Sequence, residues 1–252
     1  LDKPYLLTLG PHAFYWFSLE QRSSETATVT AAPVSAPEIP LLEAGEDWDE
    51  VLDEQKRRSL ENLLQTYIPP RRWFGGKTRI IKTARINEIL TVPTNGQKSY
   101  LLFVDLDYVQ GDIERYLLPL AFATGDEAAK LQLERPHLII ARLKLLKTGV
   151  DGVVYDGVGS RMLAQSLLDT MGRRRTLKGE HGEVKGFSLE AFRKLNGDAG
   201  TPLEPLLGRA EQSNSAILFG DKFILKTFRR LESGMNPVLE INRFLARNDF
   251  PH

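Results

Sequence analysis

The chain has 252 residues, enough for one large domain or two ordinary ones, and its 33 Lys and Arg residues balance its 33 Asp and Glu residues. The zero net charge excludes a bulk attraction to nucleic acid or anionic membranes, and the lack of cysteine excludes disulfides and thiolate metal sites. No apolar run approaches the roughly 20 residues of a membrane helix and no signal-peptide pattern is seen, so we expect a cytoplasmic protein.

The first 45 residues predict a hairpin and a linker. Residues 1–20 hold two short apolar runs separated by Gly10-Pro11, the pattern of a β-hairpin. Two strands are not stable alone, so we expect their packing partner to belong to a longer protein, as the initial Leu in place of Met also suggests. Residues 21–45 are rich in Ser, Thr, Ala and Pro, which predicts a flexible linker.

Residues 46–150 predict an α+β domain, an antiparallel sheet with flanking helices. Apolar residues at helical spacing between Trp48 and Tyr67 predict one helix, which Pro69-Pro70 ends. Strands are predicted at 79–92, 99–108, 113–124 and 137–146. In the second strand, Leu102 and Val104 face the core with their apolar neighbours, while Asp105 and Asp107 face water.

Residues 151–252 predict a second unit with less certain edges. The predicted elements are a strand at 153–155, a helix at 160–171 with Ser160 as N-cap, a strand at 183–187, a helix near 188–195, a hairpin that turns at Gly220-Asp221, and a last helix that starts at Asn236-Pro237.

The hairpin carries the residues that could perform chemistry. Strand alternation places Lys226 on one face with Ile224 and Phe228, and the small polar residues before the hairpin could offer N–H groups to phosphate. Glu240 lies in the first turns of the last helix, and protein kinases pair a strand lysine with such a glutamate. Spacing alone favours the plainer alternative, a lysine that extends to solvent and a Glu240 that pairs with Arg243.

Three segments resemble known families. AEQSNSAILFGDKFILKTFRRLESGMNPVLEINRFL, residues 210–245, resembles the phosphate loop, strand lysine and helix start of maltokinases, which are bacterial ATP-dependent sugar kinases. PPRRWFGGKTR, residues 69–79, is similar to a signature of the maltokinase N-terminal cap. GPHAFYWFSLE, residues 10–20, resembles the last strand of the C-terminal β-domain of trehalose synthases. The order of these segments implies a trehalose synthase fused through a linker to a maltokinase.

The resemblance also implies a division of the chain. Residues 46–150 would be the cap domain, and 151–252 an intermediate, truncated lobe with part of a protein-kinase-like N-lobe sheet. Lys226 would contact the phosphates of ATP, Glu240 would orient Lys226, and a phosphate loop would be formed by Gln212, Ser213, Asn214 and Ser215. The catalytic and metal residues would lie beyond residue 252, in a lobe that binds maltose and Mg²⁺.

The implied activity of the full protein is the conversion of ATP and maltose into ADP and maltose 1-phosphate, beside the isomerisation of maltose and trehalose. We expect the isolated chain to be inactive.

Two other functions stay open. The cap could be a docking or carbohydrate-interaction module that uses exposed aromatic residues such as Trp73. A nucleic-acid-binding protein is disfavoured by the zero net charge. The basic runs at 71–72 and 173–175 are more simply explained by packing or solvation, and the four histidines lack metal-ligand spacing.

Overall fold

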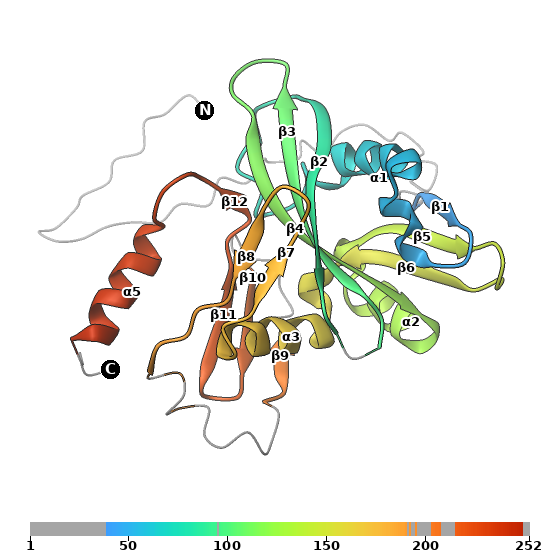
Figure 1. Cartoon of the computed structure of the whole chain (residues 1–252). Helices are drawn as coiled ribbons and strands as arrows, with labels where there is room; N and C mark the ends of the chain where they lie inside the picture. Colours follow the sequence, from blue (N-terminus) through green and yellow to red (C-terminus); the bar gives the residue numbers. More distant parts are fainter. Residues whose placement is uncertain are drawn as a thin grey trace, which may run out of the picture. The chain divides into compact units, whose positions relative to one another are not determined.

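The computed structural model of the chain describes residues 39–94, 96–190, 192, 195, 203–207 and 215–248 (Figure 1). These residues belong to one compact unit, which spans 39–252. The predicted N-terminal hairpin and most of the predicted linker lie outside the described residues.

A seven-stranded sheet forms the centre of this unit and curls from β2 to β1 (Figure 1). Its strands are β1 (Leu41–Ala44), β2 (Ile81–Val92), β3 (Ser99–Tyr108), β4 (Glu114–Thr124), β5 (Ile139–Leu145), β6 (Asp151–Asp156) and β12 (Arg230–Leu231). The order is β1-β5-β6-β4-β3-β2, with β12 paired to β4, and all pairs are antiparallel except β1 with β5. The predicted α+β class with an antiparallel-rich sheet is confirmed.

Both ends of the predicted sheet domain differ from expectation. β1 lies in the stretch predicted as linker, because Leu42 and Ala44 alternate with exposed neighbours and pack into the core beside β5. The sheet also continues past residue 150, since β6 pairs with both β4 and β5.

The predicted helix between Trp48 and Tyr67 is in fact two helices, η1 (Trp48–Leu52) and α1 (Glu54–Tyr67), separated at Asp53. Asp53 has extended backbone angles. The Glu50 carboxylate accepts hydrogen bonds from the backbone N–H groups of residues 45–47 and so closes a short turn. The Trp48 ring packs on the rings of Tyr100 and Phe122.

Helices cover both faces of the sheet. The η1 and α1 segments pack on the face that includes Leu118 and Leu120 of β4, and α2 (Gly125–Glu134) packs on the opposite face at Ala121 and Ala123. The sequence did not predict α2, because it buries only two side chains and has no long apolar stripe. A 3₁₀ turn, η2 (Pro136–Leu138), leads from α2 into β5.

The second part of the chain is built around α3 (Arg161–Gly172), which follows η3 (Gly157–Gly159). The Ser160 side chain accepts a hydrogen bond from Leu163 N, so the predicted N-cap is confirmed. Leu163 packs against β2 and β3, while Ala164 and Leu168 pack against a smaller sheet. Thus α3 holds the two sheets together.

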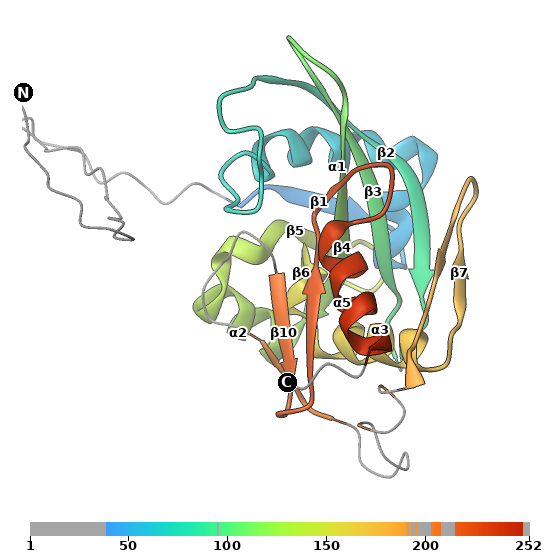
Figure 2. The same ribbon diagram turned by 90° about the vertical axis from the view of Figure 1, so that its left-hand side faces the viewer.

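The smaller sheet has the order β11-β10-β9, with β9 (Pro205–Leu207), β10 (Ser215–Phe219) and β11 (Phe223–Thr227). The short strands β7 (Thr176–Lys178) and β8 (Glu183–Lys185) form a separate hairpin. The last helix, α5 (Pro237–Arg247), begins as predicted, with the Asn236 side chain capping Val238 N. Figure 2 shows α5 beside the strands of the smaller sheet. The helix predicted near 188–195 lies partly outside the described residues.

Replacing Leu60 by Ala is expected to lower the free energy of unfolding by about 2–5 kcal/mol, because this α1 side chain is 0% exposed in the main core. Leu133→Ala is the matched control, since the α2 side chain is 85% exposed. Urea unfolding followed by circular dichroism measures both. Equal losses for the two variants would contradict the packing described.

Candidate functional site

Lys226 lies in the middle of the hairpin that the sequence singled out. β10 and β11 pair in register across the predicted turn, where Gly220 has a positive φ of 56°. Phe223 and Leu225 turn toward α3 and pack with Leu168 and Phe219, so Lys226 and Ile224 point to the other face. The predicted alternation of β11 is confirmed, and its cause is the packing of one face on α3.

The face that carries Lys226 is apolar and open. Leu218 lies between Leu206 of β9 and Ile224 of β11 in the strand register, and all three side chains are exposed, Ile224 by 67%. Ala216 is the cross-strand neighbour of Lys226. A platform of aliphatic side chains therefore ends at one ammonium group, an arrangement that suits a ligand with a flat apolar part and an anionic part.

The Lys226 ammonium lies 5.5 Å from the centroid of the Phe228 ring. No ion pair with Lys226 is found within the described part of the chain. Glu240 sits in α5, where its backbone N–H bonds to Asn236 O, and its side chain is exposed. Among the described residues, Glu240 pairs with neither Lys226 nor Arg243, so the structure does not bring together the two partners that the sequence predicted.

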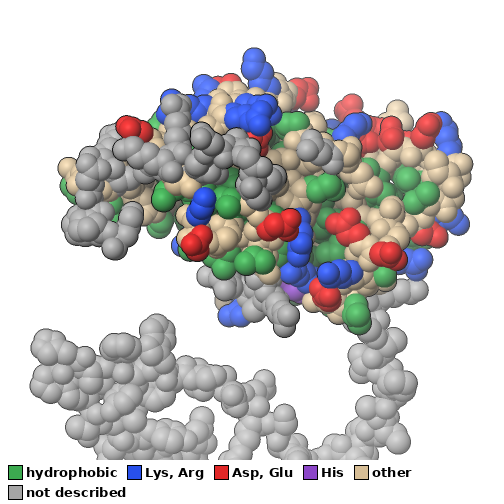
Figure 3. Space-filling model, turned by 90° about the horizontal axis from the view of Figure 1, so that it is seen from below, with side chains coloured by type: hydrophobic (Ala, Val, Ile, Leu, Met, Phe, Trp, Pro, Cys, Tyr) green, Lys and Arg blue, Asp and Glu red, His purple; other side chains and the backbone are tan. Residues whose placement is uncertain are grey.

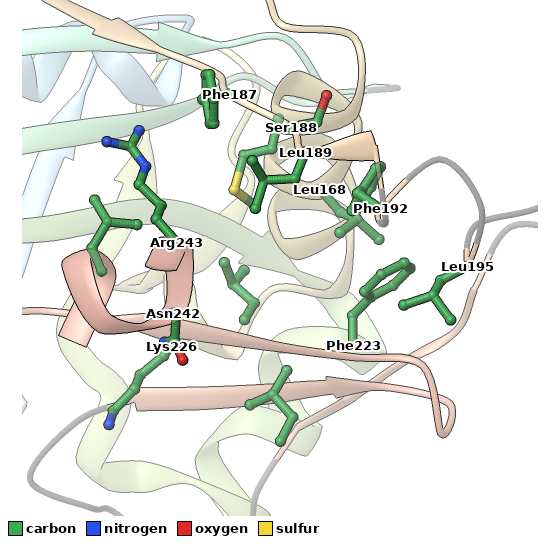
Figure 4. A pocket seen from close by; sticks show the side chains of 14 residues that line it. Leu168, Phe187, Ser188, Leu189, Phe192, Leu195, Phe223, Lys226, Asn242 and Arg243 are labelled. Atoms are coloured by element: carbon green, nitrogen blue, oxygen red, sulfur yellow. The ribbon is translucent and has the colours of Figure 1, made fainter. Parts of the chain in front are cut away.

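A cavity of about 500 Å³ lies between β11, α3 and α5 (Figure 4). Leu239, Asn242 and Arg243 are the α5 residues that line it, which leaves Glu240 outside. The Arg243 guanidinium lies 4.7 Å from the Phe187 ring centroid, and its buried Nε has no hydrogen-bond partner among the described residues. Lys226 and Arg243 both line this cavity, and Figure 4 shows their side chains pointing away from each other.

The predicted phosphate loop cannot be placed. Gln212, Ser213 and Asn214 lie outside the described residues. The backbone of Ser215 begins β10 opposite Thr227, one pair from Lys226. The loop would therefore enter the sheet beside the lysine, and its role stays a prediction.

The two family-like segments meet on the large sheet. Trp73 and Phe74 are buried, and both rings pack on Tyr116 of β4. The Arg229 guanidinium lies 4.9 Å from the Trp73 ring centroid and forms a buried ion pair with Asp156. Nothing in the sequence marked Arg229 and Asp156 as partners. The prediction of Trp73 as an exposed docking aromatic is wrong, because that ring is buried and packs on Tyr116 of β4.

The two family-like segments also meet at Glu114, which binds one arginine from each. Its Oε2 accepts hydrogen bonds from the hydroxyls of Tyr108 (2.7 Å) and Tyr116 (2.8 Å), and its Oε1 pairs with Arg79 at 2.8 Å and Arg230 at 3.3 Å. Burial raises the pKa of Glu114, but these hydrogen bonds and charges outweigh it and hold the pKa below its ordinary value of 4.5. Burial and the bond to Glu114 raise the pKa of Tyr116 to about 12.

The remaining candidates form local structure. Asp105 makes an ion pair with Arg115 at 2.6 Å on a half-exposed sheet face, and Arg173 pairs with Asp169 in α3. On the face seen from below, acidic and basic side chains of the described residues are interspersed (Figure 3). Among the described residues, no group of three His, Asp or Glu side chains is placed to hold a metal ion. No helix in the described ranges is long and apolar enough to span a membrane.

Comparison with protein families relates the centre of the chain to a known domain. Residues 67–159 match the family described as the maltokinase N-terminal cap domain. The match begins at the end of α1 and ends with η3, so it includes Trp73, Glu114 and Asp156 but neither β1 nor the smaller sheet. It relates this part of the chain to maltokinases and so supports a kinase-related protein.

Replacing Glu114 by Gln is expected to lower the free energy of unfolding by about 1–3 kcal/mol at pH 7, because Gln keeps only one acceptor oxygen and no charge for two buried tyrosine hydroxyls and two guanidinium groups. A carboxylate with a lowered folded-state pKa stabilises above its unfolded pKa, and this stabilisation is lost as the pH falls through the folded value. The difference between wild type and variant should therefore shrink below pH 4.5. Urea unfolding at pH 7 and at acid pH measures it.

Glu46→Gln serves as the control for this prediction, since its ion pair with Lys147 is exposed and should contribute nothing measurable. A loss in Glu114→Gln that does not change with pH would contradict an electrostatic role for Glu114.

Proposed function

We propose that the chain is the ATP-binding part of a maltokinase, the enzyme that transfers phosphate from ATP to maltose and forms ADP and maltose 1-phosphate. One observation carries the proposal: Lys226 lies at the end of an exposed apolar sheet face without an ion pair among the described residues, in a strand that is followed at once by β12, which pairs with β4 of the matched domain. Leu206, Leu218 and Ile224 would contact the adenine base, and the lysine would contact the phosphates.

Glu240 would join this site as the partner of Lys226 in the nucleotide-bound state. In the structure its side chain is exposed on α5, on a different side from the residues that line the cavity. An ion pair would therefore require a rotation of the helix, which a bound nucleotide could stabilise by ordering the lysine.

Mg²⁺ would neutralise the phosphate charge during transfer. The described residues do not fit a resident metal site, because no three metal-ligating side chains come together among them. We therefore assign this chain the binding of ATP and assign no step of the transfer to it.

Fusion to a trehalose synthase, which would be the partner in the same polypeptide, rests on the resemblance of residues 10–20 alone. That segment lies outside the described residues. The cytoplasmic location stays a prediction.

The docking or carbohydrate-interaction role of the cap is the second candidate. Its proposed contact residue, Trp73, is 7% exposed and already engaged with Tyr116 and Arg229. A docking module would not bind ATP, so the experiment below separates the two functions.

Lys226→Ala is expected to weaken ATP binding roughly 10- to 100-fold, because one charge-assisted contact to phosphate contributes about 1.5–3 kcal/mol. Isothermal titration calorimetry with ATP, with and without Mg²⁺, measures it on the whole chain. Lys222→Ala removes an exposed lysine from the turn of the same hairpin and should bind as wild type does. Absence of ATP binding by the wild-type chain, or equal loss in both variants, would refute the nucleotide site.

A further inference from the structure

The link between the smaller sheet and the matched domain is a buried ion pair. Arg229 Nη2 lies 2.6 Å from Asp156 Oδ2, and the two side chains are 1% and 0% exposed. Asp156 also accepts a hydrogen bond from Val158 N, and Arg229 Nη1 donates to Leu117 O at 3.4 Å. A buried guanidinium without its carboxylate is very costly, so this pair permits only arrangements in which the two groups meet.

The backbone of Arg229 also contacts the matched domain. Its carbonyl oxygen accepts a hydrogen bond from Leu117 N at 2.7 Å, and β12 then pairs with Tyr116 and Arg115 of β4. The chain that leaves β11 is therefore attached to the matched domain three residues after Lys226. On its other side, β11 is held by β10 and by packing on α3.

We propose that Arg229 and Asp156 are positioning residues for Lys226, so that the matched domain sets the place of the lysine and with it the affinity for nucleotide. This inference rests on the nucleotide site proposed above. Lys226 lies in an edge strand on an exposed face, where few contacts of its own hold it, so the position of the ammonium depends on where the strand is attached.

Stability alone does not account for an ion pair at this place. Apolar side chains of similar volume often replace buried ion pairs with no loss of stability, and in some proteins a buried polar or charged group instead restricts the chain to one arrangement. The arrangement selected here is the one that pairs residues 230–231 with β4 and places the Arg229 guanidinium over the Trp73 ring.

The test is the double variant Asp156→Leu with Arg229→Met, compared with the wild-type chain. It removes both charges, so no unpaired charge is left, and it is expected to fold with similar stability in urea unfolding. ATP affinity, measured by calorimetry, is expected to fall roughly tenfold to a hundredfold, because a small displacement of a binding group is costly. A stable double variant with wild-type affinity would overturn the proposal.

The same double change in a Lys226→Ala background provides the decisive comparison. If the pair acts through Lys226, it has no further effect on affinity once the lysine is gone, and the two changes are not additive. Additive losses would show that the pair acts elsewhere and would overturn the assignment.

Hydrogen exchange of residues 223–231 separates failure of this inference from failure of the proposed function. If the wild-type chain binds no ATP, the nucleotide proposal fails, yet the attachment of β11 is still tested. Faster exchange of these amides in the double variant supports the attachment, and unchanged exchange overturns it. If the double variant does not fold, Arg229→Lys takes its place, because lysine keeps the positive charge but lacks the planar guanidinium that binds a carboxylate with two parallel hydrogen bonds. This variant is expected to show a smaller loss of ATP affinity and a smaller increase in amide exchange.

Discussion

The buried contact between Arg229 and Asp156 is the constraint on which the arrangement of this chain depends. It joins residues far apart in sequence, Asp156 at the end of β6 in the large sheet and Arg229 just after the lysine strand. Because neither charge tolerates burial alone, the end of β6 and the start of β12 must come together. The pairing of β12 with β4 and the contact with Trp73 follow from that requirement.

The aromatic and basic residues of segment 69–79 have a structural role, because they contact Arg229 and Glu114. Trp73 and Phe74 pack on the Tyr116 ring, and the Trp73 ring also contacts the Arg229 guanidinium. Arg79, the last residue of the segment, forms an ion pair with Glu114. Glu114 is also paired with Arg230, so the two family-like segments meet twice, once where Arg229 lies over the Trp73 ring and once where Arg79 and Arg230 both pair with Glu114. The two segments that resemble maltokinase segments are thus in contact with each other in the structure.

The proposed nucleotide site depends on a contrast between the two faces of one small sheet. The inner face is covered by α3, and the outer face leaves aliphatic side chains and Lys226 open. Exposed apolar surface beside a single cation is suited to a ligand that combines a ring with phosphate. The cavity beside α5 is lined by Arg243 and not by Glu240, the predicted partner of Lys226. The position of α5 therefore differs from the one in which a kinase pairs its strand lysine with a helix glutamate.

The sequence by itself determined the elements whose signals are local. The four long strands of the sheet, the Ser160 and Asn236 caps and the Gly220 turn were predicted because alternation, capping and turn residues act over a few positions. Local spacing could not show that η1 and α1 are separate helices, since the break at Asp53 arises from the packing of Trp48 on two distant rings. It also missed α2 and the shortest strands, which have too few buried residues for a periodic pattern.

Tertiary structure decided what the charged residues do. Arg229 and Asp156 have no feature in sequence that marks them as partners, and the burial of Trp73 comes from its packing on Tyr116 and Arg229, which are far from it in sequence. The sequence placed Lys226 on a strand face with apolar neighbours, but only the fold shows that this face is exposed, that Glu240 does not pair with Lys226, and that the chain after the strand is attached to the large sheet. Burial and long-range pairing are properties of the whole chain, and no window of a few residues contains them.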